Sequence, residues 1–140
     1  MYALDGTVVY KGQWLNDVKE GNGSEYDENQ VIIFKGEFKE NKPNGFGIEY
    51  NEQAKKSYEG NYYNNMKEGH GIEWSSEEKK IYEGKFYNNL RDGYGIEYDI
   101  NTGFICFEGQ FVEDLVDGHG TQYDLNGNRY VEGIWKDTEL

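Results

Sequence analysis

The sequence is poor in several features that define common protein classes. It has one cysteine, Cys106, and one proline, Pro43, among its 140 residues. A single cysteine forms neither an internal disulfide nor a four-ligand zinc site, so nothing requires an oxidising compartment. No apolar run approaches the roughly 18 residues of a membrane span, and no basic start followed by an apolar stretch marks a signal peptide. We therefore expect a cytoplasmic protein.

Basic residues are also scarce. Fourteen lysines and arginines stand against 27 aspartates and glutamates, which gives a net charge of −13. A chain with this imbalance repels phosphate backbones and anionic lipid surfaces. Nucleic acid is therefore excluded as a partner and a membrane surface is disfavoured, whereas a basic or amphipathic protein segment is favoured.

Apolar residues make up only 36% of the chain, but aromatic residues reach 16%, with thirteen Tyr, seven Phe and three Trp. Ordinary globular domains contain about 45–50% apolar residues, and disordered chains are poor in aromatic residues. The composition therefore predicts a thin folded structure whose small core consists mainly of large rings.

Glycine is abundant, and its positions repeat. One column contains Gly12, Gly36, Gly60, Gly84, Gly109 and Gly133, and successive members are 24, 24, 24, 25 and 24 residues apart. Nine residues after each of the first five comes a GxG pair, at 21/23, 45/47, 69/71, 93/95 and 118/120. These columns hold sixteen of the nineteen glycines, so the chain is a tandem repeat of about 24 residues.

The aromatic residues follow the same frame. Most first-column glycines have one ring two residues before and another two residues after, as in Tyr82, Gly84 and Phe86. A third ring lies three residues after each GxG pair, at Tyr26, Tyr50, Trp74, Tyr98 and Tyr123. On a strand, residues i, i+2 and i+4 share a face, so each first strand presents a ring, a gap and a second ring.

The segments YEGNYYNNMKEGHGIEW and YEGKFYNNLRDGYGIEY resemble the MORN (membrane occupation and recognition nexus) motif, and the resemblance covers essentially the whole chain. The usual family period is one residue shorter, and connectors such as residues 51–57 replace the tight glycine turn of many members, which leaves the curvature of the array open. We expect one array over residues 1–140, with a half repeat over 1–9, repeats beginning near 10, 34, 58, 82 and 107, and a partial repeat over 130–140.

The predicted fold is all-β, an elongated, twisted single-layer antiparallel sheet of tandem 24-residue β-hairpin repeats. Each glycine gap should admit a ring from an adjacent strand or repeat. Tyr26 is out of phase with Gly23, which implies a β-bulge or a switch of face. The Asn- and Asp-rich segments between paired strands, one of which contains Pro43, are expected to be hairpin loops.

Residues with reactive side chains fit the repeat frame without a chemical role. His70 and His119 occupy a slot that Asn22, Phe46 and Tyr94 fill in other repeats. Cys106 has no histidine nearby in sequence, and the GxG pairs lack a phosphate-loop lysine. We therefore expect no catalytic residue, no metal ligand and no cofactor, and hence no enzyme.

Two sets of residues are candidates for partner binding. The first is an aromatic groove, expected on a concave surface, formed by Tyr26, Tyr50, Trp74, Tyr98 and Tyr123. The second is an acidic ladder, formed by Glu25, Glu49, Glu73, Glu97, Glu59, Glu83 and Glu108. The alternative for the acidic set is a solvated polar face, partly neutralised by Lys11, Lys35 and Lys85.

These features favour a non-catalytic scaffold that binds a partner segment, with edge strands available to pair with another chain. The resemblance implies a cytoskeletal, ciliary or cell-division assembly as the setting. It also implies an alternative, in which the chain is a membrane or phospholipid recruitment module or the regulatory repeat region of a larger enzyme. The incomplete repeats at both ends are consistent with a piece of a longer protein, with partners covering the edges, or with short charged ends that suffice.

Overall fold

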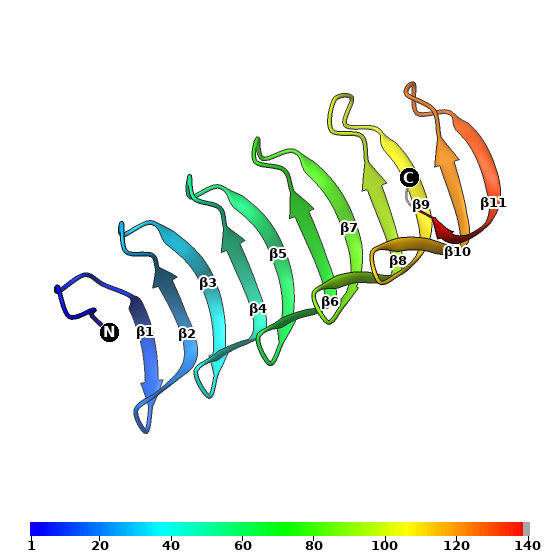
Figure 1. Cartoon of the computed structure of the whole chain (residues 1–140). Helices are drawn as coiled ribbons and strands as arrows, with labels where there is room; N and C mark the ends of the chain where they lie inside the picture. The colour runs from blue at the N-terminus through cyan, green and yellow to red at the C-terminus, as the bar shows by residue number, and fades with distance from the viewer. Residues whose placement is uncertain (139–140) are drawn as a thin grey trace.

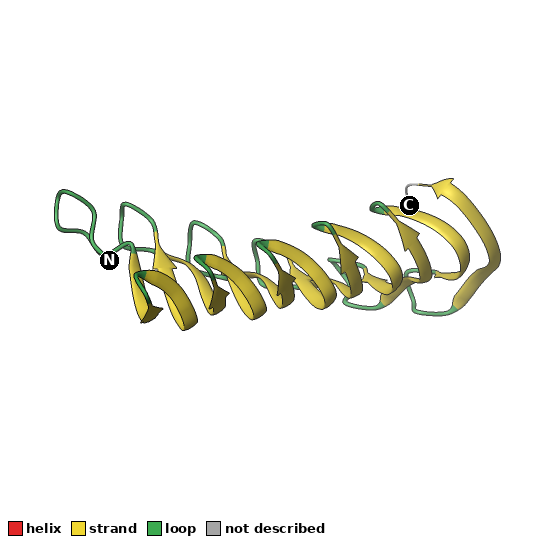
Figure 2. Ribbon diagram, turned by 90° about the horizontal axis from the view of Figure 1, so that it is seen from below, coloured by secondary structure: helices red, strands yellow, loops and turns green. Residues whose placement is uncertain are grey.

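The computed structural model describes residues 1–138, and within them the chain forms one open antiparallel sheet of eleven strands. The strands lie in the sheet in the order in which they occur in the sequence. Figure 1 shows the resulting elongated array, and Figure 2 shows that its strands are bowed. The predicted all-β, single-layer architecture of tandem hairpins is confirmed.

The strands pair as successive hairpins, and the last strand pairs with the second strand of the fifth hairpin. Their bounds are β1 (Tyr10–Leu15), β2 (Val18–Tyr26), β3 (Ile32–Lys39), β4 (Lys42–Tyr50), β5 (Lys56–Tyr63), β6 (Met66–Trp74), β7 (Lys80–Tyr87), β8 (Leu90–Tyr98), β9 (Ile105–Val112), β10 (Leu115–Tyr123) and β11 (Arg129–Thr138).

The turns inside the hairpins are shorter than the sequence suggested. Between β5 and β6 only Asn64 and Asn65 lie outside the strands, and both have positive φ, 50° and 72°. Two successive left-handed residues make a turn whose twist matches that of the strands, and Asn tolerates this conformation. Placing Pro43 in a loop is therefore wrong, because β4 begins at Lys42 and includes it.

The longer connectors between hairpins are shaped by one polar side chain each. Asn51 Oδ1 accepts hydrogen bonds from the backbone N–H groups of Gln53 (2.9 Å) and Lys55 (3.1 Å). The same column of the repeat contains Asp27, Ser75, Asp99 and Asp124, which make similar bonds. Such side chains replace the backbone partners that a turn lacks.

A continuous ladder of rings forms the core. Tyr58 packs edge-on against Tyr62 of its own strand at 5.3 Å between centroids and against Phe86 of the next hairpin at 5.2 Å. The same alternation runs through Tyr10, Trp14, Phe34, Phe38, Tyr58, Tyr62, Tyr82, Phe86, Phe107, Phe111 and Trp135. Because each ring needs rings of the neighbouring hairpin, burial is shared along the array.

Paired glycines make room for this ladder. Gly60 lies opposite Gly71, and a Cβ added to Gly60 would meet the Gly71 Cα at 2.5 Å. A Cβ on Gly71 would collide with the ring of Tyr58 on the adjacent strand. The expectation that a glycine gap admits a ring of the adjacent strand is confirmed at Gly71, whereas the gap at Gly60 is filled by the paired backbone and by the hydroxyl of Tyr58 on its own strand.

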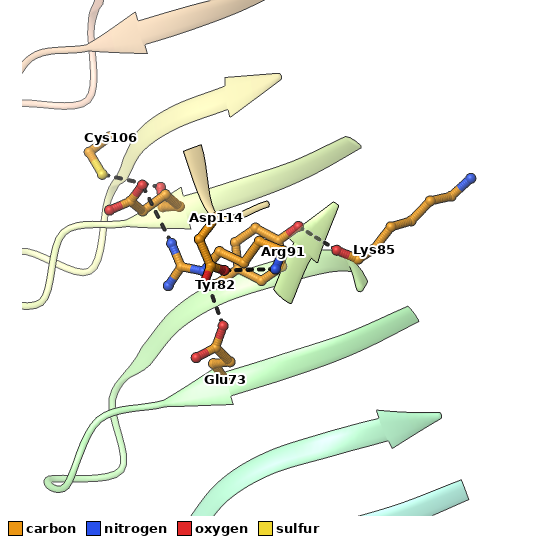
Figure 3. Close-up of polar contacts among 7 residues, drawn as sticks. Glu73, Tyr82, Lys85, Arg91, Cys106 and Asp114 are labelled. Atoms are coloured by element: carbon orange, nitrogen blue, oxygen red, sulfur yellow. Dashed lines mark hydrogen bonds and ion pairs between the residues drawn. The ribbon is translucent and has the colours of Figure 1, made fainter. Parts of the chain in front are cut away.

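Each strand bends around its own ring. The Tyr82 hydroxyl donates a hydrogen bond to the carbonyl of Lys85, three residues further along β7, at 2.9 Å. Figure 3 shows this bond, with the Lys85 side chain extending away from the ring. The rings therefore lie on the inner, concave side of the sheet. We call this side the ring face and the opposite side the outer face.

Candidate functional site

The rings are covered by a column of side chains from the second strand of each hairpin. Lys67 Nζ lies 4.7 Å from the centroid of Tyr58, and Arg91 Cζ lies 4.5 Å from that of Tyr82. A cation over an aromatic face is attracted by the ring quadrupole. The covering column, one residue per hairpin, consists of Lys19, Pro43, Lys67, Arg91 and Val116.

Carboxylates hold these cations in place. Arg91 Nε lies 3.0 Å from Glu73 Oε1 and its Nη1 lies 3.7 Å from Glu97 Oε2, so one guanidinium bridges two hairpins (Figure 3). Burial raises the pKa of Glu97, and the charge of Arg91 opposes this rise. The ring face therefore combines an aromatic floor with paired charges.

A cavity of about 640 Å³ opens on the ring face near Pro43. Its lining includes Phe34, Tyr62, Glu25 and Glu49. The Tyr62 hydroxyl donates a 2.6 Å hydrogen bond to Glu49 Oε2. Burial, and then this bond to the carboxylate, raise the pKa of Tyr62, so the phenol stays protonated.

Three of the five rings predicted to form a concave groove, Trp74, Tyr98 and Tyr123, contact side chains of the outer face. Tyr50 lies in the lining of the ring-face cavity. The register shifts beside these rings place the extra residue on the paired strand: Glu49 pairs with Tyr58 and Tyr50 with Lys56, which leaves Ser57 as the bulged residue. Of the two alternatives drawn from the sequence, the switch of face is therefore the one observed. Lys56 Nζ lies 5.5 Å from the Trp74 ring and 2.8 Å from Glu59, on the outer face. The expected concave location is wrong for these three rings, because each directly follows a residue that pairs with a ladder ring, and successive strand residues point to opposite faces. Partner binding through them stays a prediction.

The predicted acidic ladder is divided between the two faces. Glu25, Glu49, Glu73 and Glu97 pair across the strands with rings of the ladder and share the ring face. Glu59, Glu83 and Glu108 lie on the outer face. There Lys80 Nζ lies 2.8 Å from Glu83 and lowers the pKa of that carboxyl. The Tyr123 hydroxyl donates a 2.5 Å hydrogen bond to Glu108.

The outer face carries its own hollow. A cavity of about 430 Å³ is lined in part by Phe46, Ile48 and Lys35. The Phe46 side chain is 46% exposed and Tyr94, in the same slot of a later repeat, is 48% exposed. The sequence reasoning treated this slot as structural filler and did not select either ring.

The cations of the ring face were also missed. Lys19, Lys67 and Arg91 each lie five residues after the second ring of their hairpin. The sequence could have indicated these cations, because a basic residue recurs at this one position in three of the repeats.

The residues with reactive side chains are dispersed. Cys106 Sγ donates a hydrogen bond to the Glu97 carbonyl at 3.4 Å, and burial raises the pKa of the thiol to about 11. His70 and His119 are exposed on the outer face. Over residues 1–138, no group of three or more His, Cys, Asp or Glu side chains is arranged to hold a metal ion, and no helix is long and apolar enough to cross a membrane.

These features define a tandem β-hairpin repeat protein held together by a shared ring ladder. A family model for the MORN repeat matches residues 10–30, 34–51, 58–77, 82–102 and 107–129. The chain belongs to the MORN repeat family, whose arrays are often involved in membrane or protein interactions. Comparison with curated proteins gave no significant match.

Proposed function

We propose that the chain is a non-catalytic scaffold that holds a basic segment of a partner protein along its ring face. One observation carries the proposal: the cavity of about 640 Å³ in which buried rings and two carboxylates meet on this concave surface. A partner's basic side chain would find both an aromatic floor and a negative rim there. The net charge of −13 would raise the rate of encounter with basic partners.

The chemistry of the described side chains supports a role without catalysis. The Cys106 thiol, with its pKa raised to about 11, is protonated at neutral pH and is therefore a poor nucleophile. The His70 side chain is 62% exposed, and its Nε2 lies 3.8 Å from Glu83 Oε1. This pair contains no cysteine or serine that could act as a nucleophile. A cytoplasmic scaffold in a cytoskeletal or ciliary assembly is the setting that we propose, on the resemblance to the family.

A photo-crosslinking experiment tests the proposal. A crosslinking amino acid is placed at Asn65, beside the ring-face cavity, or at Asn61 on the outer face, and partners are captured from a native extract and identified. The identified partner is then purified and its affinity is measured. We expect capture from Asn65, and loss of about tenfold in affinity when Glu49→Gln and Glu97→Gln are combined, since two carboxylates of the ring face lose their charge.

A matched variant and a lipid arm make the outcome decisive. The triple variant Trp74→Ala/Tyr98→Ala/Tyr123→Ala alters the outer face, and it should bind the partner within about twofold of wild type if circular dichroism shows it folded. If this variant loses the partner and the Glu variant keeps it, the binding site is on the outer face. Sedimentation with phosphatidylserine vesicles at physiological salt should show no binding, and binding there would support membrane recruitment instead.

A further inference from the structure

The covering column of the ring face has two members that lack a long, charged side chain, Pro43 and Val116. Lys19 and Lys67 place an ammonium, and Arg91 a guanidinium, over the rings. Val116 is itself buried at 2% exposure. Pro43 alone among the five offers a short ring without charge.

The surroundings of Pro43 reproduce those of Arg91 two repeats away. Arg91 contacts the rings of Tyr82 and Phe111 and the carboxylates of Glu73 and Glu97. Moved back by two repeats, these positions are held by Phe34, Tyr62, Glu25 and Glu49. All four residues line the same cavity of about 640 Å³.

The rings beneath this cavity are less well covered than their counterparts. Phe34 and Tyr62 are 6% and 7% exposed, whereas Tyr82 and Phe111 beneath Arg91 are 0% and 2% exposed. Phe34 and Tyr62 pack edge-on at 5.2 Å, as Tyr82 and Phe111 do at 5.3 Å. The aromatic floor is therefore formed in the same way and lacks only the cation above it.

Carboxylate oxygens remain for an incoming donor. The Glu25 ion pair uses Oε1, towards Lys19 at 3.3 Å, and the Glu49 contacts use Oε2, towards Tyr62 and Lys67. No hydrogen bond or ion pair among residues 1–138 uses Oε2 of Glu25 or Oε1 of Glu49. A carboxylate accepts several hydrogen bonds, so a further donor can be satisfied at each.

We propose that this cavity is a receptor for an arginine side chain of a partner protein, which would occupy the place that Arg91 occupies two repeats away. The inference rests on the proposed function and specifies which partner side chain the ring face recognises. Arginine fits better than lysine because its planar guanidinium can stack on a ring and reach two carboxylates at once, as Arg91 does with Glu73 and Glu97.

Neighbouring cations do not prevent this occupancy. Lys19 and Lys67 flank the cavity in the covering column, and Lys42 is also in its lining. Lys67 is likewise the neighbour of Arg91 in the column, so adjacent cations already coexist on this face. Each flanking lysine is paired with a glutamate, Lys19 with Glu25 and Lys67 with Glu49.

An intramolecular test asks whether the cavity accepts a guanidinium. Pro43→Arg supplies one from the chain itself, and Pro43→Ala is the matched control, because both restore the same backbone N–H. We expect the Arg variant to melt about 2–4 °C above the Ala variant, the shift that one additional net interaction produces in a chain of this size. In a Glu25→Gln/Glu49→Gln background this difference should disappear.

A binding test uses acetyl-Gly-Gly-Arg-Gly-Gly-amide, with the citrulline peptide as a neutral isostere. Amide chemical shifts of the full chain should saturate near residues 25, 34, 49 and 62 with a Kd of about 1 mM, a plausible affinity for one side chain. The citrulline peptide should bind at least tenfold more weakly. Pro43→Arg should abolish binding, whereas Pro43→Ala should retain it.

The inference is overturned if the arginine and citrulline peptides shift the same amides equally, if shifts centre elsewhere, or if Pro43→Arg binds like Pro43→Ala. It is also overturned if the two Pro43 variants melt at the same temperature in both backgrounds. The proposed scaffold function can survive these results, because a partner crosslinked from Asn65 and lost in the Glu49→Gln/Glu97→Gln variant would still bind the ring face by other contacts.

Discussion

The two faces of this one sheet are stabilised in different ways. On the ring face, Tyr58, Tyr82 and Phe107 are fully buried and each packs against rings of the next hairpin. On the outer face, Phe46 and Tyr94 are about half exposed. The contacts there include local ion pairs such as Lys80 with Glu83. The ring face therefore couples the repeats, whereas the outer face can vary from repeat to repeat.

This difference explains the pattern of side chains along the repeat. The slot between the two glycines of each GxG pair points to the outer face and holds Asn22, Phe46, His70, Tyr94 and His119. The ring positions hold only Tyr, Phe and Trp between residues 10 and 111. Tight packing restricts a position far more than solvent exposure does.

The largest expected difference is between rings of the two faces. Tyr82→Ala should lower the free energy of unfolding by about 3–5 kcal/mol, because a fully buried ring leaves a cavity in the ladder. Tyr98→Ala, on the half-buried outer side, should cost about 1 kcal/mol. Urea denaturation of both variants measures the two losses. Equal losses would show that the ring face does not dominate the coupling between repeats.

A smaller effect is expected at the glycine pairs. In Gly84→Ala the new Cβ would lie 2.5 Å from the Gly95 Cα and 2.6 Å from the Tyr94 carbonyl oxygen, both of them backbone atoms. The strands must separate, at a cost of about 2–3 kcal/mol. Lys85→Ala, whose side chain points away on the outer face, should change stability by less than about 0.5 kcal/mol. Thermal unfolding of the pair is the measurement, and a tolerated Gly84→Ala would contradict the close approach.

Next come the cations of the two faces. Arg91→Gln should cost about 1–2 kcal/mol, because it removes a guanidinium that covers a ring and bridges two carboxylates. Lys80→Gln removes a more exposed ion pair with Glu83 and should cost about 0.5 kcal/mol. If chemical denaturation ranks them in the opposite order, the ring-face network is not the stronger one.

The smallest expected effect concerns pH. The pKa of Glu97 is raised by burial, so its contribution to stability is present at low pH and is lost as pH rises through its folded pKa. The pKa of Glu83 is lowered by Lys80, so its contribution is present above its ordinary pKa and is lost as pH falls.

Two variants separate these contributions between pH 7 and pH 3. Glu97→Gln should make the loss of stability on acidification steeper, and Glu83→Gln should make it shallower. Each change should remain below about 1 kcal/mol, since both side chains are partly exposed. Parallel curves for the two variants would mean that the faces do not differ in this respect.

Much of the fold was predictable because the repeat is visible at the level of single residues. The spacing of Gly12, Gly36 and Gly60 gave the period, and the alternation of Tyr82, Gly84 and Phe86 gave the shared face of the strand. The turns were predicted too long, because Asn64 and Asn65 alone close a hairpin and the flanking residues pair as strands. Pro43 was misplaced for the same reason.

The candidate site was predicted less well. Glu49 and Glu59 were assigned to one acidic ladder, but Glu49 pairs with the buried Tyr58, and the pleat of the strand turns the next residue, Glu59, to the opposite face. Tyr98 was expected on the concave side because the sequence did not show that its neighbour Glu97 pairs with the ladder ring Phe107. Lys19, Lys67 and Arg91 had a recurring slot, but their position over the rings depends on which neighbours the curvature brings beneath them.

The sequence by itself determined that this protein is a repeat array with an aromatic core, because period, ring columns and glycine columns are local properties of the chain. Only the tertiary structure decided which face each ring and carboxylate occupies, since the strand pairing fixes which second-strand residues lie beside the ladder rings. It also decided that the ring face is concave and that Glu25, Phe34, Glu49 and Tyr62 meet around one cavity. These residues come from four strands, β2, β3, β4 and β5, which belong to three successive hairpins, so their meeting depends on packing between repeats.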